Sequence, residues 1–123
     1  MNRIETFPVS IRCYADPDIR TLMVEHGGMA ALGRWVALLG LLYDSHGCMK
    51  LTKVNRAVIE DTLQMDGDGL DAFLASCAER EFIDAGMLSR GSIVSHGVQK
   101  QIEYIEKKQT SGSKGGKAKR GKG

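Results

Sequence analysis

The chain has 123 residues, of which 42% are hydrophobic and 26% are charged, and its formal net charge is +2. These values are typical of one globular domain, and no apolar run is long enough to span a bilayer. The longest such run, residues 29–43, is short and contains Arg34. We therefore expect a single cytoplasmic domain that does not associate with membranes.

Charge is divided unevenly along the chain. Residues 107–123 hold seven of the 17 lysines and arginines and no acidic residue, whereas residues 1–106 hold the other ten against all 15 acidic residues. After Thr110 the sequence consists of Gly, Ser, Lys and Arg with a single Ala, so it cannot bury enough apolar surface to fold. The sequence predicts a folded domain over residues 1–108 and a flexible basic tail over residues 109–123.

Two helices are predicted in the first third of the chain. The first follows Asp16, a good N-cap, and has Pro17 at its first position; Gly27 and Gly28 end it. The second covers about residues 29–46 and is apolar on nearly every side, which is typical of a helix that is buried or shared with a partner.

A strand, two helices and a hairpin are predicted next. Residues 48–51 favour a short strand, residues 53–64 a helix capped by Thr52, and residues 70–80 a helix after the turn at 66–69. Apolar pairs at 82–83, 87–88 and 93–94, separated by turn residues, are typical of a small hairpin. A last helix is expected over residues 97–108. This order predicts a mainly α, winged helix-turn-helix fold with a small β-hairpin wing, extra flanking helices and a disordered basic C-terminal tail.

No pattern in the sequence indicates catalysis, a cofactor or a metal site. The Asp66–Gly69 run lacks the rest of an EF-hand loop, because its twelfth position is Cys77, where Glu is needed. His26 and His46 each precede a Gly, which fits the C-terminus of a helix better than a histidine metal site. The cysteines form no Cys-x-x-Cys pair and are expected to be buried, small apolar side chains: Cys13, Cys48 and Cys77.

Five segments, spread over most of the chain, have a sequence pattern typical of a known family. They are residues 15–29 (ADPDIRTLMVEHGGM), 33–44 (GRWVALLGLLYD), 70–84 (LDAFLASCAEREFID), 94–102 (VSHGVQKQI) and 111–120 (SGSKGGKAKR). Together they resemble the N-terminal domain and linker of phage replisome-organiser (replication-initiation) proteins, a domain related to the DnaD-type winged helix. The resemblance implies a non-catalytic, DNA-associated adaptor of phage replication that self-associates and contacts other replication proteins.

Weak, salt-dependent nucleic-acid binding is predicted for the cationic end of the chain, because flexible cations can follow a phosphate backbone and release its counterions. A solubilising linker is the alternative for the tail. Carboxylates around the fourth helix argue against its entry into a major groove; the alternative, in which Gln64, Ser76 and Arg80 read bases, stays open. The candidate nucleic-acid-binding residues are Arg90, Lys100, Lys107, Lys108, Lys114, Lys117, Lys119, Arg120 and Lys122.

Protein contacts are predicted for the folded body. Large aromatic side chains contribute strongly to interfaces, so the second helix is a candidate homodimer surface, with core packing as the alternative. The candidate protein-interface residues are Trp35, Leu39, Tyr43, Asp66, Asp68 and Asp71. Replication proteins, or other phage or host proteins, are the expected partners. Two other functions stay open: a phage-encoded inhibitor, counter-defence or regulatory, that acts through an acidic surface, and a winged-helix transcription regulator.

Overall fold

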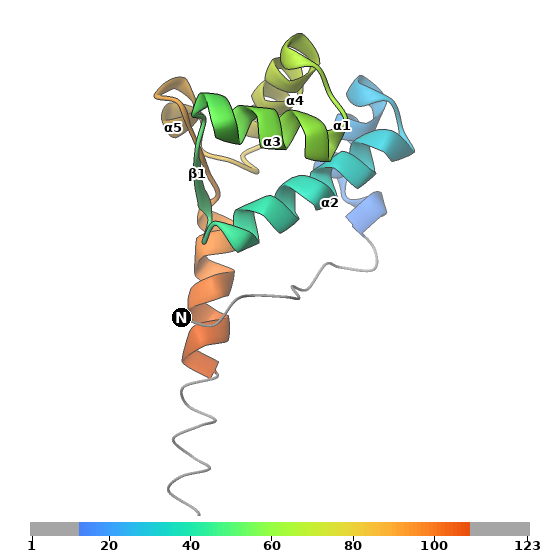
Figure 1. Cartoon of the computed structure of the whole chain (residues 1–123). Coiled ribbons are helices and arrows are strands. Elements are labelled where there is room, and N and C mark those ends of the chain that lie inside the picture. The colour runs from blue at the N-terminus through green and yellow to red at the C-terminus, as the bar shows by residue number, and fades with distance from the viewer. Residues whose placement is uncertain (1–12, 109–123) are drawn as a thin grey trace, which may run out of the picture.

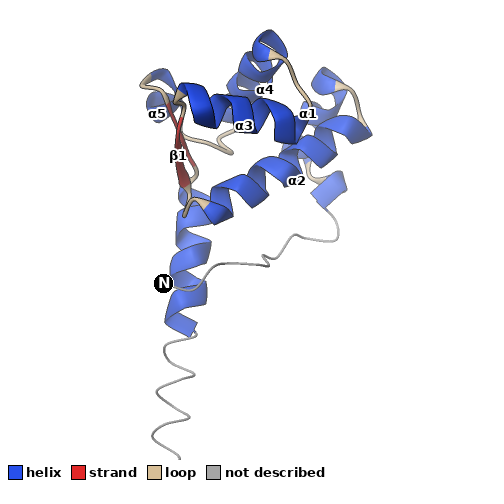
Figure 2. Cartoon of the chain, viewed as in Figure 1, coloured by secondary structure: helices blue, strands red, loops and turns tan. Residues whose placement is uncertain are grey.

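The computed structural model describes residues 13–108, and this part of the chain is mainly helical with one small antiparallel sheet (Figures 1 and 2). The elements in chain order are the 3-10 turn η1 (Cys13–Ala15), α1 (Pro17–His26), α2 (Met29–Asp44), β1 (Cys48–Lys50), α3 (Lys53–Leu63), α4 (Gly67–Glu79), α5 (Ala85–Ser89), β2 (Ser92–Val94) and a C-terminal helix over residues 96–108. This composition is compatible with a winged helix. The predicted flexible tail, residues 109–123, lies outside the described residues.

The predicted starts of α1 and α3 are confirmed, because side chains cap them locally, whereas α4 begins at Gly67, within the predicted turn. The Asp16 carboxylate accepts hydrogen bonds from the backbone N–H groups of Asp18 and Ile19, at 2.9 and 3.3 Å. The Thr52 hydroxyl accepts from Asn55 N–H at 3.1 Å, at the start of α3. Each cap satisfies backbone donors that a helix leaves without an internal partner.

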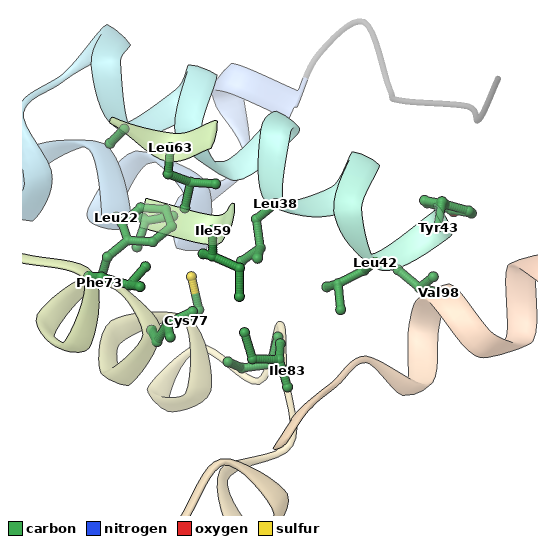
Figure 3. Close-up of a cluster of buried hydrophobic side chains, with 14 of the residues drawn as sticks. Leu22, Leu38, Leu42, Tyr43, Ile59, Leu63, Phe73, Cys77, Ile83 and Val98 are labelled. Atoms are coloured by element: carbon green, nitrogen blue, oxygen red, sulfur yellow. The ribbon is translucent and has the colours of Figure 1, made fainter. Parts of the chain in front are cut away.

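One apolar core holds the helices together (Figure 3). Every helix from α1 to α4 contributes to it, and so do the sheet and the C-terminal helix. Its most deeply buried large side chains, each less than 2% exposed, are Leu22, Leu42, Ile59, Leu63, Leu70, Phe73, Leu74 and Ile93. The predicted apolar stripe of the fourth helix, Leu70, Phe73, Leu74 and Cys77, is buried as a whole. The core therefore fixes which face of each helix remains at the surface.

The predicted hairpin at residues 82–94 is wrong. Residues 85–89 form the short helix α5 instead, because the Asp84 carboxylate caps it by accepting from Met87 N–H at 2.9 Å. Gly91, with φ of 88°, then turns the chain into β2. β2 pairs with β1, which lies more than 40 residues earlier, in the antiparallel register Cys48↔Val94, Met49↔Ile93 and Lys50↔Ser92. The sheet therefore joins two distant parts of the chain and contains no hairpin after α4.

The C-terminal helix leaves the body from the end of the sheet and extends away from the other helices (Figure 1). Its first turns are anchored, because Val98 and Ile102 are 3% and 6% exposed and belong to the core. Val98 lies beside Leu42 and Tyr43 of α2 in Figure 3. The far end, which carries Lys107 and Lys108, is exposed. The helix therefore presents the end of the described chain at a distance from the core.

Candidate nucleic-acid interface

Four of the predicted nucleic-acid-binding residues lie within the described chain, and all four are exposed. Arg90 follows the last residue of α5, whereas Lys100, Lys107 and Lys108 lie on the C-terminal helix. The other five are outside the described residues: Lys114, Lys117, Lys119, Arg120 and Lys122. The structure thus separates Arg90, at one end of the sheet, from the helix that leaves its other end.

The C-terminal helix presents a cationic ridge that contains an aromatic residue. Lys100, Tyr104 and Lys108 follow one another at four-residue intervals, which places them on the same face of the helix, and all three are exposed. The Tyr104 side chain is 58% exposed, although large aromatic side chains are commonly buried. We call these three residues the C-terminal ridge. An aromatic ring between two cations is the combination that binds single-stranded nucleic acid, by stacking and by phosphate contact.

Tyr104 and Lys50 were missed at the level of sequence. The four-residue spacing of Lys100, Tyr104 and Lys108 was a usable signal for Tyr104. Lys50 and Arg90 lie at the same end of the sheet because β1 pairs with β2. Next to them, Leu51 N–H donates to the Gly91 carbonyl at 2.8 Å. Only the long-range pairing of the strands brings the two exposed cations, Lys50 and Arg90, to one end of the sheet.

The exposed face of α4 is acidic. Asp68, Asp71 and Glu79 are exposed along it, and the exposed positions between them are alanines. The Arg80 guanidinium is already paired with the Glu25 carboxylate of α1, 3.1 Å away, so it is not a free reading group. A helix that presents carboxylates and Ala methyls to solvent is repelled by phosphates and offers few donors to bases.

Two ion pairs divide the acidic surface. The Arg56 guanidinium of α3 lies 2.7 Å from Asp71 and also donates to the Gly67 carbonyl at 3.0 Å. The hydrogen bond from Arg80 holds the pKa of the Glu25 carboxyl below its usual value, although partial desolvation acts in the opposite direction. Asp71 near the start of α4 and Glu25 of α1 beside its end are therefore paired with guanidinium groups, which place positive charge within the acidic surface.

A polar cluster joins α1 to α4 beside the Glu25–Arg80 pair. Ser76 Oγ donates to Glu25 Oε2 at 3.2 Å and lies 2.7 Å from His26 Nε2, and the His26 ring packs edge-on against Phe73. In a catalytic triad the carboxylate orients the imidazole. Here the Glu25 carboxylate contacts the serine, so the cluster bridges two helices without that arrangement.

The predicted protein-interface residues of α2 pack within this chain. Tyr43 is 7% exposed and belongs to the core. Trp35 and Leu39 are partly buried against the same core, and the Trp35 ring lies 5.9 Å from the Phe82 ring, centroid to centroid. Core packing, the alternative left open for these residues, therefore describes their surroundings.

The predicted acidic interface residues have separate local roles. Asp66 caps α4 by accepting from Gly69 N–H at 2.8 Å, and Asp71 pairs with Arg56. Asp68 is exposed in the first turn of α4, where a carboxylate is favoured by the helix dipole. Helix capping and ion pairing within the chain therefore explain Asp66 and Asp71 without a protein partner.

The described residues contain no group of three or more His, Cys, Asp and Glu side chains placed to hold a metal ion. Within the same part of the chain, no helix combines the length and apolar character needed to cross a membrane. None of the protein-family models, curated proteins and solved structures with which the chain was compared matches it.

Proposed function

We propose that this chain is a non-catalytic, DNA-associated adaptor whose C-terminal helix and basic tail hold nucleic acid without sequence preference. The observation that carries the proposal is the C-terminal ridge, an exposed Lys100–Tyr104–Lys108 row on a helix that points away from the body. In sequence this helix continues directly into the stretch that has seven cations and no acidic residue. In sequence, residues 109–123 therefore add five cations and no acidic residue directly after the ridge.

The fold supports this proposal as a reduced winged helix. In this assignment α3 and α4 correspond to the helix-turn-helix, the β1–β2 pair stands in for the hairpin of the wing, and α5 takes the place of the missing wing strand. The order α2, β1, α3, α4, α5, β2 agrees with that assignment. The resemblance of the sequence to phage replisome-organiser proteins, stated above, favours a role in replication with phage or host proteins as partners.

Binding through the ridge follows from ordinary polyelectrolyte physics. Each lysine that neutralises a phosphate releases a condensed counterion, so affinity falls steeply as salt rises. Tyr104 adds a ring on which a base of a single strand can stack. The acidic face of α4 is better suited to partners other than DNA. This argues against the role of a sequence-reading transcription regulator. The inhibitor alternative requires a continuous acidic surface, and the Arg56–Asp71 and Arg80–Glu25 pairs interrupt it.

The test measures the affinity for labelled single-stranded and duplex DNA by fluorescence anisotropy over a range of salt concentrations. In the full chain, Gln replaces the five tail cations, Lys114, Lys117, Lys119, Arg120 and Lys122. We expect the slope of log affinity against log salt to flatten by up to about 4.5 for duplex DNA, in proportion to the phosphates that these residues neutralise. The Lys100→Gln, Lys108→Gln double variant removes up to about 2 from the same slope.

Two further variants distinguish the ridge from α4. Tyr104→Ala weakens binding to the single strand by about 1–3 kcal/mol and leaves the salt slope unchanged, because it removes stacking and no charge. Glu79→Gln, on the exposed face of α4, is the matched control and leaves affinity unchanged. A tail variant with the slope of the original chain contradicts the proposal, and a gain in affinity for Glu79→Gln shows that α4 faces the DNA.

A separate measurement addresses the protein partners. The chain is used to capture proteins from host lysate with and without nuclease treatment. Partners that bind the body remain after the nuclease, whereas proteins bridged by nucleic acid are lost. The adaptor role predicts both groups. The inhibitor alternative predicts the first group alone, with binding weakened by neutralising Asp68 and Glu79.

A further inference from the structure

One face of α3 is apolar and exposed. Val54 is 72% exposed and Val58 is 44% exposed, and Ala57 lies between them on the same face. The opposite face of the helix enters the core through Ile59 and Leu63, which are 0% and 2% exposed. A shallow depression follows the exposed face and is lined only by α3 residues: Lys53, Val54, Ala57, Val58 and Asp61. Within the described chain, no residue of another element lines this depression.

We propose that this α3 face binds a second copy of the chain, with the two α3 helices antiparallel across a twofold axis. Lys53, Ala57 and Asp61 follow one another at four-residue intervals and make one ridge of the helix. The two charged residues lie at equal distances from Ala57, about 6 Å along the helix axis on either side. A twofold axis beside Ala57 then places Lys53 opposite the partner's Asp61 at both ends of the contact.

The charge pattern selects a second copy over other occupants. A twofold interface must be complementary to itself, and a ridge that reads positive, apolar, negative becomes complementary when the helix is reversed. Its net charge is zero, which offers nothing to a nucleic acid or to an anionic membrane surface. The small Ala57 at the centre lets the two helices approach closely, and Val54 and Val58 lose their exposed apolar area against the partner.

The α3 face replaces α2 as the candidate dimer surface. The aromatic residues of α2 are already packed: Tyr43 is in the core and Trp35 lies against Phe82. A contact between two helices of 11 residues is smaller than the interfaces of stable dimers, which bury about 1,200–2,000 Å². We therefore expect a weak, reversible dimer, with a dissociation constant on the order of 0.1–1 mM. This inference does not depend on nucleic-acid binding.

The test follows self-association of the full chain by sedimentation equilibrium up to about 1 mM, near the expected dissociation constant. Val58→Asp, at an exposed position, introduces like charges at the centre of the contact and makes the chain monomeric throughout. Lys53→Glu and Asp61→Lys each place like charges opposite one another, so each variant alone is monomeric. Both changes place charges that interact favourably with the α3 dipole, so neither is expected to unfold the helix. Circular dichroism checks that the fold is kept when self-association is lost.

Mixing the two charge variants gives the decisive result. A Lys53→Glu chain carries two acids on its ridge and an Asp61→Lys chain carries two lysines, so the antiparallel contact between them restores both ion pairs. The mixture, and the Lys53→Glu, Asp61→Lys double variant alone, are expected to associate, whereas Glu79→Lys on α4 leaves association unchanged. A wild-type chain that is monomeric at about 1 mM, or a mixture that stays monomeric, overturns the proposal.

Discussion

The His96 Nε2 and Asp84 Oδ2 atoms lie 2.7 Å apart, and this contact joins the start of α5 to the start of the C-terminal helix. The other Asp84 oxygen accepts the hydrogen bond from Met87 N–H that caps α5. The contact with His96 lowers the pKa of the Asp84 carboxyl, and the hydrogen bond from Met87 lowers it further. One carboxylate therefore holds a short helix and orients the element that carries the C-terminal ridge.

The lowered pKa of Asp84 predicts a loss of stability in acid. A carboxyl whose folded-state pKa is depressed stabilises the fold above its unfolded pKa of about 3.9, and this contribution disappears as pH falls through the folded-state value. Asp84→Asn keeps an N-cap but loses the charge that pairs with His96. We expect this variant to have a lower urea midpoint than the original chain at pH 6, with the difference shrinking as the pH is lowered below about 4.

Glu103→Gln, an exposed carboxylate change on the C-terminal helix, is the control for a change of net charge alone. If the difference between Asp84→Asn and the original chain is the same at every pH, the stabilisation does not come from the ionised Asp84 carboxylate.

Local signals predicted every α-helix of the described chain except the short α5, because the causes of the others lie within a few residues. Asp16, Thr52 and Asp66 each cap a helix through bonds to residues two or three positions later. The apolar stripe of α4 follows a spacing of three and four residues, and burial of one helix face is sufficient to explain it. Such features can be predicted without knowledge of the rest of the fold.

Features that depend on distant residues were not predictable in the same way. The strand at 92–94 was assigned to a local hairpin, whereas its partner is β1. Cys48 was expected to be buried with Cys77, but it is exposed on β1, where Met49 alone turns toward the core. The sequence pattern of α3 does not tell whether its apolar face is buried or exposed. Each of these outcomes depends on which element lies opposite, and no local pattern specifies that.

Two glycines in the first half of the chain predict stability changes of opposite sign. Gly47 has φ of 83°, and a Cβ there meets the Gln99 side chain and lies 3.2 Å from the Gln99 nitrogen and 3.3 Å from the Ser95 carbonyl oxygen. Gly47→Ala is expected to destabilise the fold by about 1–2 kcal/mol or more, from backbone strain and crowding. Gly33 lies inside α2 with open space around it, so Gly33→Ala stabilises by about 0.5–1 kcal/mol. Urea denaturation measures both, and equal effects contradict this explanation.

Arg34 of α2 predicts a specific contribution to the end of α3. Its Nε and NH2 groups donate to the carbonyls of Leu63 and Gln64, at 2.9 and 3.2 Å, where the helix leaves acceptors without internal partners. Arg34→Met keeps much of the apolar stem and removes both bonds, so we expect a loss of about 1–2 kcal/mol, reduced by the partial exposure of the side chain. Arg34→Lys loses less, because one donor remains.

The control for Arg34 is Arg20→Met on the exposed surface of α1, for which a change within about 0.5 kcal/mol is expected. If both variants lose the same stability in urea, the effect comes from charge or stem packing and not from the two hydrogen bonds.

The cysteines predict a selective pattern of alkylation. Cys77 is 0% exposed in the core, and burial raises the pKa of its thiol to about 12, so the reactive thiolate is scarce and shielded at neutral pH. Cys48 is exposed on β1. Native protein treated briefly with N-ethylmaleimide at pH 7.5 should therefore be modified at Cys48 and remain unmodified at Cys77, as read by peptide mass spectrometry. In 8 M urea both thiols should react at similar rates.

A core substitution tests the same packing, because Cys77 becomes accessible only when α4 leaves the core. Phe73→Ala opens the same core and costs about 3–5 kcal/mol, so it should accelerate the labelling of Cys77 in native buffer. Rapid native labelling of Cys77 in the unaltered chain contradicts the packing of α4 described above.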